Sequence, residues 1–357
     1  MVESLRLQRF RSYRDDSFEF DTGVNIIVGP NASGKTNLLE ALQVVCAGGS
    51  FRAKDSELVA FGAPWARLDT NGAAGVRTVK LLVQENGSIK KEFVIGDQKL
   101  VRLSLQKSLP IVLFEPNHLL LLHGSPDRRR DYLDDLLEQT VIGYGKTRRD
   151  YRRALAQRNA LLKRGPMARG QLFAWDIRLS EIGAHVARER HALVEKITSQ
   201  IGSLYEDLAH SKAAKVSVTY VTDYDIDQYS SALLRALERC QDTDIERGYT
   251  TIGPHREDLE VTFNGRHASE VASRGETRTA LLAFKVMELQ FVEEARGARP
   301  LLLLDDVFSE LDGARRKALT EVIHGYQAFI TTTDADVVVQ HFMNNCRIIP
   351  LGISETV

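Results

Sequence analysis

An eight-residue segment, Gly29 to Thr36, constrains the fold of this 357-residue chain more than any other feature. It reads GPNASGKT, matches the pattern GxxxxGK[ST] at every fixed position, follows the apolar run 24–28 and opens a helical pattern. In such a strand–loop–helix unit, backbone N–H groups curl around a phosphate and the helix N-terminus adds its positive dipole. The sequence therefore predicts an α/β nucleotide-binding domain. The residues predicted to bind the nucleotide are Gly29, Pro30, Asn31, Ala32, Ser33, Gly34, Lys35 and Thr36.

A pair of acidic residues ends an apolar strand far along the chain. Four leucines, 301–304, precede Asp305 and Asp306. We expect Asp305 to hold Mg²⁺ together with the Thr36 hydroxyl. Side chains alternate along a strand, so Asp306 is expected on the opposite side, where it would polarise the attacking water. With Lys35 reaching the β- and γ-phosphates, these residues form the predicted catalytic set.

The spacing of these motifs predicts a discontinuous domain. Lys35 and Asp305 lie 270 residues apart, which is farther than one compact domain needs. Helical periodicity dominates between these two residues and predicts two long helices joined by a reversal of the chain. The second of these helices, about 35 residues long, would span roughly 50 Å. We expect an α/β head from residues 1–124 and 250–357, with a mixed sheet and a small antiparallel β lobe. Residues 125–249 would form an inserted α-helical arm domain, either as a projecting hairpin or as ordinary bundle packing.

Composition excludes several classes of protein. The 47 basic and 48 acidic residues give a net charge of −1, and 43% of residues are hydrophobic, as in ordinary globular proteins. No apolar stretch approaches the roughly 18 residues of a membrane span, and the first residues lack a signal peptide, so we expect a cytoplasmic protein without membrane contact. Three distant cysteines without a CxxC pair, and nine scattered histidines, indicate no metal site besides that for Mg²⁺.

Basic residues are concentrated between Lys146 and Arg164, where eight stand against one acidic residue. Four of them lie on neighbouring helical turns and are expected to face away from the apolar side of the helix: Arg148, Arg149, Arg152 and Arg153. Two interpretations remain open, a solvated basic face or a surface that contacts the DNA phosphate backbone. No base-reading motif is visible, so recognition of a particular DNA sequence is not expected.

Five further segments resemble the RecF family of SMC-like, ABC-type ATPases. They are residues 7–13 (LQRFRSY), 124–130 (GSPDRRR), 253–258 (GPHRED), 273–276 (SRGE) and 309–312 (SELD). The resemblance extends from about residue 5 to about residue 335 and implies an ABC-type ATPase head. One segment departs from the ABC pattern, because Thr331 to Asp334 stand where transporters have a switch histidine. A threonine or Asp334 would act in its place, or nothing does, and Glu115 is the candidate for the Q-loop.

The resemblance also implies roles for particular residues. Arg11 would bind ATP, and a D-loop would contain Ser309 and Asp312. The signature Ser273, Arg274 and Gly275 would face the γ-phosphate held by a second subunit. The implied protein is an ATP-dependent homodimer with weak, Mg²⁺-dependent, DNA-stimulated ATPase activity.

The same resemblance implies a role in DNA repair. The dimer would act on gapped or single-strand/duplex DNA, help RecR/RecO-type mediators load RecA, and support replication and the SOS response. The alternative is an ABC-type ATPase subunit of a transport or nuclease complex. A transporter is disfavoured by the absent LSGGQ glutamine, and a nuclease partner by the absent long coiled coil.

Overall fold

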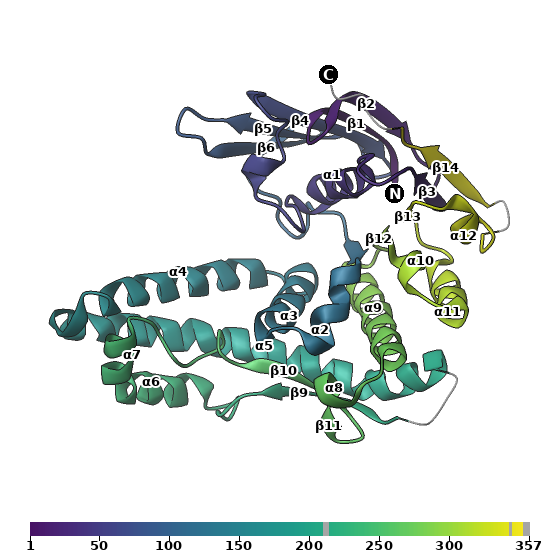
Figure 1. The fold of residues 1–357 in the computed structure, drawn as a ribbon. Helices are drawn as coiled ribbons and strands as arrows, with labels where there is room; N and C mark the ends of the chain where they lie inside the picture. The colour runs from purple at the N-terminus through teal and green to yellow at the C-terminus, as the bar shows by residue number, and fades with distance from the viewer. Residues whose placement is uncertain (210–213, 343–344, 353–357) are drawn as a thin grey trace. The chain divides into compact units, whose positions relative to one another are not determined.

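The computed structural model describes residues 1–209, 214–342 and 345–352, and it divides into two compact units (Figure 1). The head unit contains Met1–His118 and Glu288–Val357, and the helical unit contains Leu119–Met287. The insertion therefore begins close to the predicted residue 125. Its end differs from the predicted 249, because β10 (Asp258–Phe263) pairs with β9 (Val216–Val221) inside the helical unit.

The head unit is built on a parallel sheet with the strand order β14-β3-β13-β12-β8. The strands are β3 (Val24–Val28), β8 (Ile111–Phe114), β12 (Leu301–Asp305), β13 (Ala328–Thr332) and β14 (Cys346–Pro350). Apolar residues fill β12 and β13 because helices or other strands cover both faces of a parallel sheet. The carboxyl ends of β3 and β12 lie at the same edge, so the segments after Val28 and Leu304 meet there.

A second, antiparallel sheet completes the head unit, in the order β2-β1-β4-β5-β6-β7. Its strands are β1 (Val2–Phe10), β2 (Tyr13–Glu19), β4 (Trp65–Gly72), β5 (Arg77–Val83), β6 (Ile89–Ile95) and β7 (Gln98–Leu100). The predicted fold class is confirmed with one difference in detail: parallel and antiparallel strands form separate sheets instead of one mixed sheet.

Helix α1 (Lys35–Ala47) contacts strands of both sheets. Leu38, Leu42 and Val44 are fully buried, in one apolar cluster with Phe10 of the antiparallel sheet and Phe329 of the parallel sheet. A helix that is apolar on nearly all sides belongs in a core. The phosphate loop is therefore anchored at its carboxyl end by a helix that is packed from several directions.

Short helices follow the parallel strands. They are α10 (Val307–Glu310), α11 (Gly313–Ile323) and α12 (Ala335–Val339), and one 3-10 turn, η1 (Asp55–Glu57), precedes β4. Another turn, η2 (Pro116–Leu119), ends at the boundary between the two units. Helix α9 (Arg274–Arg296) begins in the helical unit and ends in the head unit.

The helical unit is dominated by α4 (Tyr144–Leu162) and α5 (Arg169–Ala209), which run side by side (Figure 1). The 41 residues of α5 span roughly 60 Å. The apolar face of α5 packs against α4, α6 (Tyr229–Arg239) and β9. Of the two alternatives for the inserted helices, a projecting hairpin or ordinary bundle packing, the second describes α5. The remaining elements are α2 (Leu120–His123), α3 (Pro126–Thr140), η3 (Gly165–Ala168), α7 (Gln241–Arg247), β11 (Arg266–His267) and α8 (Ala268–Val271). No helix among the described residues is long and apolar enough to cross a bilayer.

Candidate nucleotide site

The loop between β3 and α1 has the conformation that a phosphate loop requires. Gly34 has a positive φ of 94°, and a Cβ atom there would lie 3.0 Å from the Tyr13 hydroxyl. A Cβ atom on Gly29 would lie 2.6 Å from the carbonyl oxygen of Leu351. These two positions therefore need glycine for the turn and for the close backbone approach.

Lys35 lies over this loop at the start of α1. Its ammonium group donates hydrogen bonds to the carbonyl oxygens of Gly29, at 2.7 Å, and Pro30, at 2.8 Å. Burial lowers the pKa of Lys35, while the charges of Asp306 and Asp305 oppose that change. The ammonium group thus lies at the loop, where phosphate oxygens could replace the two carbonyls as its partners.

The two predicted Mg²⁺ ligands are in direct contact. The Thr36 hydroxyl lies 3.0 and 3.1 Å from the two carboxylate oxygens of Asp305. Residues 269 positions apart are therefore joined at one edge of the parallel sheet. Mg²⁺ prefers oxygen ligands and takes few from the protein, with phosphates and water supplying the rest. A hydroxyl and a carboxylate side by side fit that ion.

Asp306 has an unusual backbone conformation beside this pair. Strand β12 ends at Asp305, and Asp306 has a left-handed φ of 51°, so the alternation rule that placed its side chain does not apply. One oxygen of its carboxylate, Oδ1, is buried and has no hydrogen-bond partner among the described residues. Left-handed non-glycine residues and unpaired buried polar atoms are concentrated at functional sites.

Strand β13 contributes Thr331, the first residue of the segment 331–334, to the acidic pair. Its hydroxyl donates to Oδ1 of Asp305 at 2.8 Å and accepts the backbone N–H of Asp306 at 2.9 Å. Asp334, the other candidate in this segment, caps α12 by accepting the N–H of Asp336 at 3.0 Å. Of the predicted replacements for a switch histidine, the structure brings Thr331 to the site. Glu115 directly follows β8, and its predicted role remains a prediction.

Arg11 forms a contact that sequence reasoning missed. Its guanidinium donates to both oxygens of Glu40, each at 2.8 Å, and Glu40 is a fully buried residue of α1. Arg11 also lines a cavity of about 540 Å³ with Ser12 and Asn37, the residue after Thr36. The available signal was the single acidic residue within the apolar sequence of α1.

The predicted signature forms the N-terminus of α9. The backbone N–H of Ser273 donates to the Glu276 carboxylate at 2.8 Å, and the N–H of Glu276 donates to the Ser273 hydroxyl at 3.2 Å. This reciprocal pair is a capping box, which fixes where the helix begins. Arg274 and Gly275 follow as its first residues. Their predicted contact with a second subunit remains a prediction.

The predicted D-loop residues both stabilise turns after β12. The Ser309 hydroxyl donates to the carbonyl oxygen of Asp306 at 2.7 Å. Asp312 caps α11 by accepting the N–H of Arg315 at 3.0 Å. Both contacts shape the chain directly after the acidic pair, and the roles in a dimer remain predictions.

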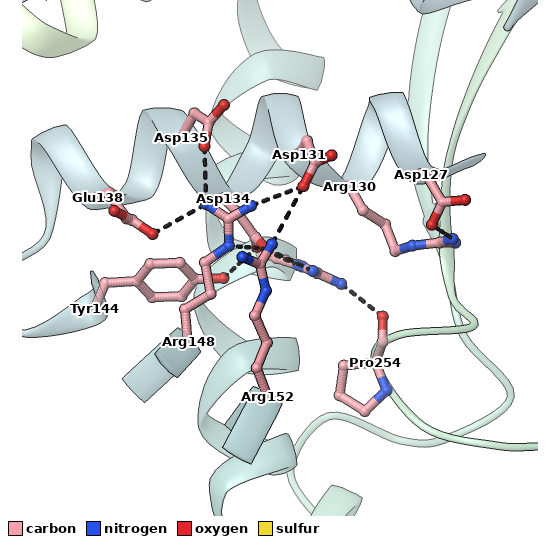
Figure 2. Close-up of polar contacts among 11 residues, drawn as sticks. Asp127, Arg130, Asp131, Asp134, Asp135, Glu138, Tyr144, Arg148, Arg152 and Pro254 are labelled. Carbon is pink, nitrogen blue, oxygen red and sulfur yellow. Dashed lines mark hydrogen bonds and ion pairs between the residues drawn. The ribbon is translucent and has the colours of Figure 1, made fainter. Parts of the chain in front are cut away.

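The structure corrects the assignment of Arg148 to an exposed basic face. Its side chain is only 10% exposed, and Figure 2 shows its guanidinium among acidic side chains of α3. The ion pairs join Arg148 to Asp131 at 2.7 Å, Asp134 at 2.9 Å, Asp135 at 2.8 Å and Glu138 at 3.0 Å. Four carboxylates hold this cation, so it is not available to a DNA phosphate. The acidic residues at helical spacing along α3 were the signal that could have shown this.

The other three arginines of the cluster are exposed, as predicted. The side chains of Arg152 and Arg153 are 61% and 72% exposed. Each has one long ion pair of 3.4 Å, to Asp131 and Asp150 respectively. Exposed pairs of this kind contribute little stability and leave the cations accessible.

Two of the family-like segments are joined inside the helical unit. Arg129 donates to both carboxylate oxygens of Asp258, at 2.8 and 2.7 Å, and Arg130 donates to the carbonyl oxygen of Glu257 at 2.7 Å. His255 lies between the Tyr151 hydroxyl, at 2.7 Å, and the carbonyl oxygen of Thr250, at 3.1 Å. Burial lowers the pKa of His255 to about 4. These contacts indicate that segments 124–130 and 253–258 stabilise the helical unit.

The parallel sheet, the phosphate loop and the acidic strand end together define a phosphate-loop nucleotide-binding head. The RecF/RecN/SMC N-terminal domain family matches residues 1–350. The DNA replication and repair protein RecF of Heliobacterium modesticaldum is 34% identical, covering 93% of this chain and 92% of that protein. The RecF of Symbiobacterium thermophilum is 35% identical, covering 94% and 92%. The chain therefore belongs to the RecF family, as the sequence motifs predicted.

Solved structures agree with this assignment. A structure of the recombination mediator protein RecF-ATPrS in the RecFOR pathway is 30% identical, with a TM-score of 0.85 over 95% of this chain and 94% of that one. A structure of RecF-ATP gives 30% identity and a TM-score of 0.82 over 93% and 92%. An SMC head bound to the C-terminal winged-helix domain of ScpA is 17% identical, with a TM-score of 0.53 over 95% and 91%, and shares the fold alone.

Proposed function

We propose that this chain is an ATP-dependent DNA-binding repair protein that dimerises with ATP on gapped or single-strand/duplex DNA. The contact between Thr36 and Asp305 carries the proposal, because it joins the phosphate loop to the acidic strand end that its chemistry needs. The relatives support it, since solved RecF structures are described with ATP or ATPrS, in the RecFOR pathway. The dimer would help RecR/RecO-type mediators load RecA and so support replication, recombination and the SOS response.

Its reaction is Mg²⁺-dependent hydrolysis of ATP, which DNA would stimulate. Thr36 and Asp305 would hold the ion, and Mg²⁺ neutralises phosphate charge when bound. Lys35 binds the phosphates, and the Asp306 carboxylate accepts a proton from the water whose oxygen attacks the γ-phosphorus. The bond to the bridging oxygen breaks, leaving ADP and inorganic phosphate. Thr331 positions both acidic residues through its two hydrogen bonds.

DNA binding would use the exposed arginines of α4. Arg149, Arg152 and Arg153 present cations to the phosphate backbone, which has the same charge whatever the base sequence. We therefore propose binding without sequence specificity. A protein that acts on bacterial chromosomal DNA works where that DNA lies, so we also propose a cytoplasmic location.

The decisive test is Lys35→Met, measured by titration with a fluorescent ATP analogue. The loop loses the ammonium that faces the phosphates, so binding should be lost or nearly lost. Lys317→Met is the matched control, because it removes an exposed lysine of α11 in the same unit. Micromolar ATP affinity retained by Lys35→Met would overturn the nucleotide site and with it the proposed function.

A further inference from the structure

A buried carboxylate next to the phosphate loop has no part in the chemistry described above. Glu40 lies on α1, one helical turn after Thr36, and its side chain is 0% exposed. An ionised carboxylate is stable in such a place only when it is paired and hydrogen-bonded. Burial alone would raise the pKa of Glu40, but hydrogen bonds from Arg11, Ser50 and Arg52 outweigh burial and hold the pKa below its ordinary value. Glu40 is therefore an anion in the core of the head unit.

Glu40 belongs to a closed ring of hydrogen bonds. Arg11 donates to both of its oxygens at 2.8 Å, and Arg52 donates to Glu40 at 3.2 Å and to Asn37 at 2.6 Å. Asn37 in turn donates to the Ser12 hydroxyl at 2.9 Å. Since Ser12 follows Arg11, the ring closes through the backbone. These hydrogen bonds connect the β1–β2 turn and the segment after α1 to α1, the helix that begins at the phosphate loop.

The ring fixes the orientation of Arg11. The backbone of Arg11 has a left-handed φ of 52°, in a tight turn, and its side chain is 19% exposed. A bidentate pair with a carboxylate holds the plane of a guanidinium, whereas a single contact does not. The pair uses Nε and Nη2, so the N–H groups of Nη1 are outside it. The guanidinium groups of Arg11 and Arg52 share the Glu40 carboxylate, and of these two arginines it is Arg11 that lines the 540 Å³ cavity.

We propose that Glu40 is a positioning residue for nucleotide binding, which holds Arg11 in the cavity wall so that its free N–H groups meet the nucleotide. The proposal rests on the proposed function: Asn37, which directly follows Thr36, lines the cavity, and the proposal places part of the bound nucleotide there. Glu40 acts through Arg11 and touches no ligand itself. Its effect should therefore disappear when Arg11 is absent, which a purely structural carboxylate would not show.

The test is a double-mutant cycle in ATP affinity. Glu40→Gln keeps the shape of the side chain but cannot form the charged bidentate pair, so affinity should fall about tenfold. Arg11→Ala should weaken binding by at least as much. The double variant should bind no more weakly than Arg11→Ala alone, because one residue acts through the other. Glu57→Gln is the control for charge: it removes a carboxylate that acts on Arg11 only at longer range, and should bind ATP at least as tightly as the unchanged chain.

Two outcomes would overturn the proposal. One is Glu40→Gln with unchanged affinity, and the other is a double variant whose losses multiply to about a hundredfold. If Glu40→Gln does not fold, Arg11→Lys replaces it, since lysine keeps the cation beside Glu40 without a fixed plane. Wild-type affinity in Arg11→Lys would then show that orientation has no effect. Lys35→Met distinguishes failure of this inference from failure of the proposed function. If Lys35→Met loses ATP binding while Glu40→Gln binds ATP normally, the role of Glu40 is contradicted and the nucleotide site is not.

Discussion

A single hydroxyl, that of Thr331, organises the acidic end of β12. It donates to the Asp305 carboxylate and accepts the N–H of Asp306, so both residues are fixed from a neighbouring strand. Asp306 leaves the strand geometry at this point, with φ at 51°. Its buried Oδ1 remains without a partner among the described residues, which fits the proposed role of a base that would accept a proton from water.

Asp306→Asn tests that role directly. An amide of the same size cannot accept the proton, so hydrolysis at saturating ATP should slow by about a hundredfold, within the range for a lost general base. ATP affinity should be preserved, because the phosphate loop is unchanged. Both quantities can be measured on one sample, by phosphate release and by titration.

Asp334→Asn provides the comparison. Asparagine is also a good helix cap, so α12 and the rate of hydrolysis should be retained. If Asp306→Asn hydrolysed ATP at the normal rate and Asp334→Asn lost hydrolysis, the role of general base would move from Asp306 to Asp334.

Residues with a fixed spacing were predictable and residues paired by folding were not. The phosphate loop and Asp305 follow from local patterns, and the edge of a parallel sheet brings them together. Arg148 and Glu40 depend on partners 10 to 29 residues away. The acidic spacing of α3 and the single acidic residue of α1 indicate that a charge is buried, but they do not identify its partner, so Arg148 was assigned to a surface and Glu40 was overlooked.

At the level of elements, the strands that are buried on both faces were the ones that could be predicted from the sequence. Strands β3 and β12 were predicted because a strand covered on both faces reads as an unbroken apolar run. Strand β2 was missed because most of its residues are polar and exposed. Strand β9 and helices α6 and α7 were missed as well, which is why the predicted end of the helical insertion differed from the observed one.

The exposed face of α4 yields a prediction about DNA. Replacing Arg149, Arg152 and Arg153 with alanine should weaken binding equally for all DNA sequences. The dependence of log affinity on log salt concentration should become shallower by about one unit for each lost phosphate contact. Fluorescence anisotropy on gapped DNA at several salt concentrations measures this slope. An identical slope would assign these residues to a solvated face.

Arg148→Ala is the matched control from the same helix. It removes the cation that four carboxylates surround, so its main effect should be on folding, with a loss of about 2 kcal/mol in the free energy of unfolding. Urea denaturation measures that loss. The salt slope of DNA binding should stay that of the unchanged chain, and a shallower slope would return Arg148 to the DNA surface.

At the level of the whole molecule, the two halves of the predicted ATPase site lie in different units of the chain. The phosphate loop and the acidic pair belong to the head unit, whereas Ser273 and Gly275 belong to the helical unit at the start of α9. Helix α9 then continues into the head unit. If the signature acts on the nucleotide of a second subunit, ATP binding and dimerisation become one event.

Ser273→Arg tests that coupling. The change removes the capping hydroxyl and places a large cation where a second head would close in the proposed dimer, so ATP-dependent dimerisation should be absent in sedimentation. ATP hydrolysis and ATP-stimulated DNA binding should be lost with it, while each subunit still binds ATP through Lys35. Ser273→Ala separates added bulk from the loss of the hydroxyl. It loses the cap, at a cost of about 1 kcal/mol, and the expected hydroxyl contact with the γ-phosphate, but it adds no bulk, so the dimer should be weakened and not abolished.

Mixing Ser273→Arg with Lys35→Met gives the sharper form of this test. Each mixed dimer retains one composite site, built from an intact phosphate loop on one chain and an intact signature on the other. Partial hydrolysis in the mixture, absent from either variant alone, is expected only if the signature acts across the dimer. A mixture that stays inactive while both variants fold would argue against action in trans. A Ser273→Arg protein that still forms the ATP-dependent dimer and hydrolyses ATP normally would remove the signature from the site altogether.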